Sequence, residues 1–95
     1  MYEMHYRVRL HDTDAAGLLF FTSQLRVAHD AFSEFLAERG LPLGDTLRRG
    51  DYLLPIVHAE ADYRAPLFVD DRLTVRLTVE RIGDRSVTFA CLFLM

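Results

Sequence analysis

The stretch Asp12-Thr13-Asp14-Ala15-Ala16-Gly17-Leu18-Leu19-Phe20-Phe21 leads directly into the longest helical pattern of this chain. Thr22 or Ser23 can serve as the N-cap of that helix, and Gly40, with Pro42 two positions further on, is typical of its end. Apolar residues recur between these points at helical spacing: Leu25, Ala28, Phe32, Phe35 and Leu36. The pattern therefore predicts one long helix of about four to five turns, entered through an acidic loop.

On both sides of this helix, apolar and polar residues alternate in the manner of half-buried strands. The first predicted strand covers residues 5–11, and the second covers residues 55–64. A third begins at Asp70-Asp71, and the pair Gly83-Asp84 makes a tight connection to a fourth. The residues expected on the core side of the first, third and fourth strands are Tyr6, Val8, Leu10, Leu73, Val75, Leu77, Val79, Val87, Phe89, Cys91 and Phe93.

The predicted elements follow the order strand, helix, and then a run of strands joined largely by hairpins. This order is typical of an α+β fold in which an antiparallel sheet carries one helix along it. Residues 41–54 are predicted to form a loop with room for a short turn around Leu47. The 95 residues are enough for a single domain, 1–95.

The chain stops at Met95, in the middle of an apolar strand. Native domains rarely end on an uncovered apolar strand, because its free edge invites pairing with other chains. We therefore expect a domain that is truncated at its C-terminal end and lacks its last strand, or one that exchanges a strand with a partner chain.

Composition excludes several classes of function. The net charge of −3, without a long run of either sign, argues against a nucleic-acid partner, which needs a basic field. The single cysteine, Cys91, allows no intrachain disulfide and fits a reducing compartment. No targeting signal is visible and no apolar run approaches the roughly 18–20 residues of a membrane span, so a cytoplasmic location is expected.

Asp14 is the candidate for chemistry, because a carboxylate just ahead of a helix start lies beside free backbone N–H groups. Hydrolysis of an acyl group needs a base or nucleophile and a donor for the developing oxyanion. The ordinary alternative is an Asp that caps a turn, and the residues alone leave that alternative open. Asp12 is expected to hold the loop through backbone contacts, and Gly17 to permit a backbone turn or the close approach of a substrate.

The segment from Asp12 to Gly17 resembles the Asp-x-Asp-x-x-Gly signature of the hot-dog-fold acyl-CoA thioesterases of the 4-hydroxybenzoyl-CoA thioesterase family. A second similar segment runs from Leu54 to Leu67, followed by Asp70-Asp71-Arg72-Leu73. The family's usual Gly is replaced there by Asp70, and we expect a change in turn geometry. The resemblance spans nearly all of residues 5–95 and implies a hot-dog fold, an antiparallel sheet wrapped around one long central helix.

The resemblance also implies roles for individual residues. Asp14 is implied as the catalytic carboxylate, acting as general base on water or as nucleophile, and the backbone amide of Phe21 as the group that polarises the thioester carbonyl. Candidate substrate contacts are Gly17, His29, Tyr63 and Arg64, although a structural or interface role is the ordinary alternative for His29 and a place in the core is the alternative for Tyr63. Some Arg must meet the phosphates of coenzyme A, and the candidates are Arg64, then Arg72, Arg48 and Arg49.

The implied function is hydrolysis of an aromatic or other acyl-CoA by a homodimer or homotetramer whose sites lie between subunits. Residues 28–32 and 55–59 look most like the 1,4-dihydroxy-2-naphthoyl-CoA hydrolases of quinone biosynthesis. No metal or redox cofactor is implied, since coenzyme A is part of the substrate. Two alternatives stay open: a hot-dog enoyl-thioester hydratase or dehydratase, which needs a positioned His beside the Asp, and a non-catalytic acyl-CoA-binding remnant.

Two other parts of the sequence contain residue types that can carry chemistry. His58, Glu60 and Asp62 share one strand face, and a metal site there is conceivable, but such polar clusters are more often solvated or interface faces. No metal site is predicted. Cys91 has no His paired with it in sequence and is expected to be part of the core.

Overall fold

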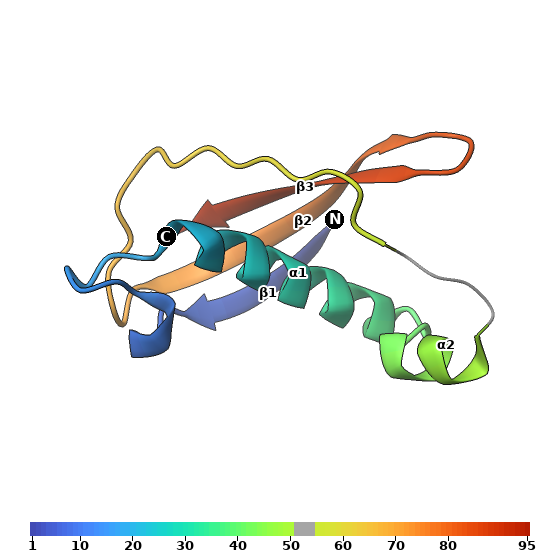
Figure 1. The fold of residues 1–95 in the computed structure, drawn as a ribbon, viewed down its shortest axis with the longest axis horizontal. Coiled ribbons are helices and arrows are strands. Elements are labelled where there is room, and N and C mark those ends of the chain that lie inside the picture. The colour runs from blue at the N-terminus through green and yellow to red at the C-terminus, as the bar shows by residue number, and fades with distance from the viewer. Residues whose placement is uncertain (51–54) are drawn as a thin grey trace.

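The computed structural model describes residues 1–50 and 55–95 of the chain. They form a three-stranded antiparallel sheet in the order β1-β2-β3, with one long helix laid across one face (Figure 1). The elements are β1 (Tyr2–Arg7), the 3-10 helix η1 (Leu10–Asp12), α1 (Phe21–Glu38), α2 (Leu43–Arg49), β2 (Arg72–Ile82) and β3 (Val87–Leu94). The predicted α+β architecture, with an antiparallel sheet and one long helix, is confirmed.

The strand register places apolar side chains of the sheet under α1. Tyr6 lies opposite Leu73, and Val75 lies opposite both Met4 and Phe93. Because side chains alternate along a strand, these residues share the inner face. The buried core cluster contains Val8, Val27, Ala31, Leu73 and Val75, with Met4, Tyr6, Leu19, Leu67, Cys91 and Phe93 packed against it. The predicted inner faces of β2 and β3 are confirmed around this cluster, although Val79 and Val87 lie beyond it and are exposed.

Helix α1 begins earlier than predicted. Neither Thr22 nor Ser23 is the N-cap: that position is taken by Phe20, whose carbonyl oxygen accepts the Ser23 N–H at 2.9 Å. The predicted end is confirmed, since Gly40 follows the C-cap Arg39 with a left-handed φ of +80°.

The face that α1 buries also differs from the predicted stripe. Ser23, Val27 and Ala31 are buried, whereas Leu25 is 40% exposed. The buried residues of α1 recur at every fourth position, so they lie on one face of the helix, and the larger apolar residues lie beside that face. Two of them, Phe32 and Phe35, are half-buried, and their rings lie 5.0 and 6.2 Å from the ring of Phe89.

The first strand ends at Arg7 and does not continue to residue 11 as predicted. Val8 is buried as expected, but Leu10 is 76% exposed because the chain turns through η1. The turn is tightened by Asp12, whose carboxylate points inward and accepts the Arg9 N–H at 2.8 Å. This bond takes the place of the strand pairing that the alternating pattern had indicated.

Part of the predicted loop 41–54 is helical. Helix α2 follows Pro42, whose carbonyl oxygen accepts the N–H groups of Asp45 at 3.1 Å and Thr46 at 3.2 Å. Thr46 is buried beneath this turn. Residues 51–54, which complete the predicted loop, lie outside the described residues.

Residues 55–64 are not a strand in this structure, and that prediction is wrong. They have no regular secondary structure and, apart from the half-buried Ala61, they are exposed. An extended segment becomes a strand only when its N–H and C=O groups pair with a neighbour, and no described strand pairs with this one. In Figure 1 the segment returns as an open trace from the α2 end of the molecule toward the end at which α1 begins.

The turn before β2 contains an unusual residue. Asp70 has a φ of +71°, in the left-handed region that favours glycine. Asp70 therefore adopts a conformation that is open to glycine, and the expected change in turn geometry relative to the family stays a prediction. Its N–H donates to the Val8 carbonyl at 2.8 Å, which holds the turn against the end of β1.

Candidate active site

Asp12 anchors the acidic loop to the core. Its side chain is fully buried. The carboxylate accepts hydrogen bonds from the Tyr6 hydroxyl at 2.6 Å, from the Arg9 N–H at 2.8 Å and from the Arg26 guanidinium. Its carbonyl oxygen accepts the Phe20 N–H at 2.9 Å. Asp12 thus joins β1, the loop and the start of α1, which is the structural role predicted for it.

The charge of Asp12 is stabilised by these contacts. Burial by itself raises the pKa of the Asp12 carboxyl, but the bonds from Tyr6, Arg9 and Arg26, together with the Arg26 charge, outweigh burial and lower it. Burial and the hydrogen bond to Asp12 raise the pKa of the Tyr6 hydroxyl. The pair Asp12 and Arg26 is therefore ionised around neutral pH, with Tyr6 as a neutral donor.

Asp14 lies two residues further on, in an exposed turn. Its Oδ1 accepts the N–H groups of Ala16 at 2.9 Å and Leu18 at 3.2 Å. Its carbonyl oxygen accepts the Gly17 N–H at 3.0 Å, and Gly17 has a φ of +77°. This confirms the predicted backbone turn at Gly17. Within residues 1–50 and 55–95 no donor reaches Oδ2 of Asp14, so that oxygen is available to a substrate or water.

Residues 17–19, which follow the turn at Asp14, are hydrogen-bonded to the segment before β2. The Leu19 N–H donates to the Leu67 carbonyl at 2.7 Å, and the Val69 N–H donates to the Gly17 carbonyl at 3.3 Å. The Asp14 N–H donates to the Leu18 carbonyl at 2.9 Å and closes the turn. Asp14 is therefore held at the tip of a hydrogen-bonded loop.

Phe21 is the first residue of α1. The first N–H groups of a helix have no acceptor inside it, and in the described part of the chain no side chain caps this end. The carbonyl oxygen of Phe21 accepts a hydrogen bond from the Tyr63 hydroxyl. The positive end of the helix dipole and the Phe21 N–H are thus available to a developing negative charge.

A hollow of about 270 Å³ lies beside the loop and the helix start. It is lined by Leu18, Leu19, Gln24 and residues 63–67. Two predicted substrate contacts, Tyr63 and Arg64, meet in it. Gln24 was not predicted from the sequence, although its place three residues after Phe21, on the same side of the helix, is a signal that could have found it.

Other predicted site residues lie elsewhere. His29 is exposed on α1, its ring 5.9 Å from that of Phe32, and it does not line the hollow. Of the candidate phosphate contacts, Arg48 pairs with Asp45 on α2, and Arg72 lies on the sheet. Neither of these two arginines lines the hollow that Arg64 lines.

The polar residues of the segment 55–64 form exposed pairs. His58 Nε2 lies 3.8 Å from Glu60 Oε2, and Arg64 lies 3.6 Å from Asp62. Among the described residues no three His, Cys, Asp or Glu side chains gather as metal ligands. In the same part of the chain, neither helix has the combined length and apolar character needed to cross a membrane.

Comparison with known proteins adds to this geometry. The family model described as thioesterase-like superfamily matches residues 8–95. A 1,4-dihydroxy-2-naphthoyl-CoA hydrolase of Rippkaea orientalis is 40% identical over 77 residues, which cover 81% of this chain and 56% of that protein. The enzyme of the same name from Synechococcus elongatus is 39% identical over 83 residues, covering 86% of this chain and 61% of that one. The chain therefore spans between half and two thirds of these relatives.

Solved structures show the same fold. A gentisyl-coenzyme A thioesterase superposes with a TM-score of 0.89 at 30% identity, covering 97% of this chain and 74% of that one. A 1,4-dihydroxy-2-naphthoyl-CoA thioesterase from Synechocystis superposes with a TM-score of 0.84 at 35% identity, covering 97% of this chain and 66% of that one. The hot-dog fold implied by the resemblance is confirmed.

Proposed function

The chain belongs to the thioesterase-like superfamily, and from this membership we propose that it hydrolyses the thioester bond of an acyl-CoA to a free acid and coenzyme A. One observation carries the proposal. The acidic loop holds Asp14 with one carboxylate oxygen unbonded among the described residues, and the same loop runs directly into the uncapped N-terminus of α1. A base and an oxyanion donor are the two groups that this hydrolysis needs.

In the proposed reaction Oδ2 of Asp14 takes a proton from a water molecule, whose oxygen attacks the thioester carbonyl carbon. Alternatively Oδ2 attacks that carbon directly, and water then hydrolyses the resulting anhydride. In both routes the carbonyl oxygen becomes negatively charged and accepts the Phe21 N–H. The C–S bond breaks when this intermediate collapses, and the thiolate of coenzyme A leaves and takes up a proton.

For the substrate we propose an aromatic acyl-CoA, with 1,4-dihydroxy-2-naphthoyl-CoA of quinone biosynthesis as the first candidate. The names of the relatives at 39–40% identity support this choice. Tyr63 and Arg64 line the hollow together with Leu18 and are proposed to contact the substrate. Gly17, the residue before Leu18, is a further proposed contact. His29 is a proposed contact only for a longer substrate, because it lies two turns along α1 from Phe21. A cytoplasmic homodimer or homotetramer belongs to the same proposal.

The test is thiol release from dihydroxynaphthoyl-CoA, 4-hydroxybenzoyl-CoA and aliphatic acyl-CoAs by the wild type, by Asp14→Asn and by the control Asp45→Asn. Asp45 is an exposed residue of α2, outside the site. We expect Asp14→Asn to lose about 100-fold or more in rate, the usual contribution of a general base or more, and Asp45→Asn to keep its rate. Equal rates in all three proteins would refute the role of Asp14. Hydration of an enoyl-CoA without thiol release, or acyl-CoA binding without any reaction, would replace hydrolysis by one of the two alternatives.

A further inference from the structure

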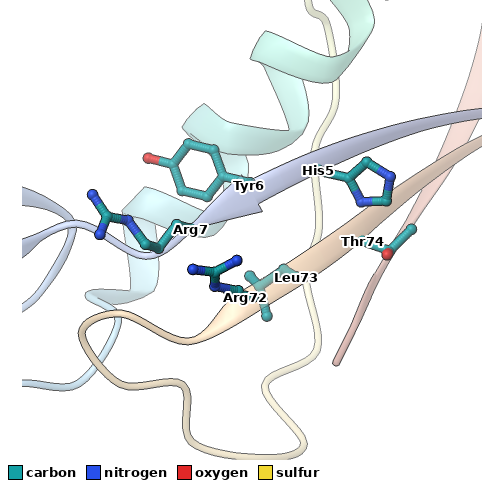
Figure 2. A pocket seen from close by; sticks show the side chains of 6 residues that line it. All are labelled: His5, Tyr6, Arg7, Arg72, Leu73 and Thr74. Atoms are coloured by element: carbon teal, nitrogen blue, oxygen red, sulfur yellow. The ribbon is translucent and has the colours of Figure 1, made fainter.

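The face of the sheet opposite α1 carries a second hollow, of about 480 Å³. It is lined by His5, Tyr6 and Arg7 of β1 and by Arg72, Leu73 and Thr74 of β2 (Figure 2). Tyr6 and Leu73 belong to the inner face of the sheet, where they pack on or within the core cluster. The alternation of side chains therefore leaves His5, Arg7, Arg72 and Thr74 as the outward-facing groups.

These four residues form two directly opposed pairs. Arg7 lies opposite Arg72, and His5 lies opposite Thr74. Side chains of opposed residues begin about 4.5–5.5 Å apart, and like charges in that position destabilise a sheet. Figure 2 shows the two arginine side chains at the same end of the strand pair, with their guanidinium groups apart from each other in this view. The register thus places two positively charged residues at directly opposed positions.

Little negative charge offsets this pair. Asp70 lies 3.6 Å from Arg7, but the two side chains are 73% and 62% exposed, so water screens the interaction. The nearest carboxylate along β1, that of Glu3, is bonded to Arg76 at 2.9 Å. Within residues 1–50 and 55–95, Arg72 has no carboxylate within ion-pair distance. The charged residues that line the hollow are therefore basic.

We propose that this hollow binds a phosphate group, held between the guanidinium groups of Arg7 and Arg72. Planar guanidinium groups donate paired hydrogen bonds to phosphate oxygens, and a dianion between them removes the repulsion of the opposed pair. The Thr74 hydroxyl and the His5 ring, on the adjacent pair, complete the donors. The site lies on the opposite face of the sheet from α1 and uses neither Asp14 nor Phe21, so it does not depend on the proposed hydrolysis.

The experiment is an NMR titration of ¹⁵N-labelled protein with inorganic phosphate, with chloride added to keep the ionic strength constant. Saturable shifts are expected in the amides of residues 5–7 and 72–74. Arg72→Ala should weaken binding about tenfold or more, since it removes a charge-assisted donor pair. The control Arg81→Ala removes the same charge from an exposed position of β2, and it should change the affinity by less than about twofold because screening limits distant charges.

A second variant is expected to change the phosphate affinity in the opposite direction. It keeps the test informative if Arg72→Ala misfolds. Asp70→Asn removes the only carboxylate of the described residues that pairs with Arg7, so phosphate binding should become tighter. Competition by coenzyme A, and its loss with dephospho-coenzyme A, would identify the 3′-phosphate of coenzyme A as the source of the phosphate. Binding of inorganic phosphate without such competition would indicate a free phosphate or another phosphate ester.

Three results would overturn the proposal. The first is the absence of saturable shifts at residues 5–7 and 72–74. The second is an equal loss of affinity in Arg72→Ala and Arg81→Ala, which would mean that only net charge matters. The third is protein-concentration-dependent broadening of these amides without phosphate, which would assign the face to contact between two copies of the chain.

Discussion

Replacing Asp12 by Asn tests whether the buried ion pair organises the acidic loop. Asn has nearly the same shape but offers one acceptor oxygen where the carboxylate offers two. The structure aims three donors at that carboxylate: the Tyr6 hydroxyl, the Arg9 N–H and the Arg26 guanidinium. At least one donor then faces the amide nitrogen, which cannot accept it.

The expected loss follows from these donors. A hydrogen bond to a charged group contributes about 1.5–3 kcal/mol, and leaving a buried donor unpaired costs about 1–3 kcal/mol. The Arg26 side chain is 46% exposed and can form hydrogen bonds to water when its partner is lost, which reduces its part of the loss in stability. We therefore expect Asp12→Asn to lower the free energy of unfolding by about 2–4 kcal/mol, out of about 5–14 kcal/mol for a domain of this size.

Urea unfolding followed by circular dichroism measures this loss. The control Asp30→Asn removes the other carboxylate near Arg26, which is exposed and 4.0 Å away, and should change stability by less than about 0.5 kcal/mol. The pKa of Asp12 is lowered in the folded state, so its contribution is present above the unfolded pKa of about 3.9 and is lost as the pH falls through the folded value. The gap between wild type and Asp12→Asn should therefore narrow in acid.

Two results would refute this reasoning. One is an Asp12→Asn protein as stable as Asp30→Asn at neutral pH, which would mean that the buried contacts contribute little. The other is a gap that keeps its full size well below the ordinary carboxyl pKa, because protonation of Asp12 in the wild type should remove the same charge that the substitution removes.

Three further predictions concern the turns and the thiol. Gly17→Ala should cost about 1–2 kcal/mol in urea unfolding through the left-handed φ alone, since nothing lies within 4 Å of the added Cβ; an unchanged midpoint would contradict the described turn. Asp70→Gly should stabilise the protein by up to about 1 kcal/mol and Asp70→Ala should destabilise it, because only glycine takes a φ of +71° without strain. Equal thermal midpoints for the two variants would argue against that conformation. Burial raises the pKa of the Cys91 thiol from 9.0 to about 11. At about pH 8, alkylation of Cys91 should therefore be about 100-fold slower in the folded protein than in urea, as followed by mass spectrometry. Equal alkylation rates would show that the thiol is exposed.

Helix α1 shows what the spacing of apolar residues can and cannot predict. Spacing of apolar residues predicted α1 correctly as the one long helix and Gly40 as its end. It did not identify the buried face, because two neighbouring stripes of α1 are apolar or small. The choice of Val27 and Ala31 over Leu25 depends on how closely the helix backbone approaches the sheet, and that distance is a property of the packed structure.

The segment 55–64 shows a different limit. Its alternating pattern is that of a strand, yet strand formation requires a partner with free N–H and C=O groups in register. In the described part of the chain the three strands pair only with one another, and this segment is left unpaired. A local pattern describes what a segment is suited for, and the pairing depends on which other segment is present beside it.

The sequence by itself determined the α+β class, most of the inner faces of β2 and β3, and the acidic loop that enters α1, because each depends on local spacing and turn chemistry. The sequence and its family resemblance suggested different roles for the two carboxylates of that loop, but only the tertiary structure shows the contacts that make them different. Asp12 is buried among Tyr6, Arg9 and Arg26, while Asp14 keeps one oxygen free of described donors. The catalytic role of Asp14 stays a prediction. The difference between the two arises from donors as far as 14 residues away in sequence, and a buried charge needs such partners, which only folding brings to it.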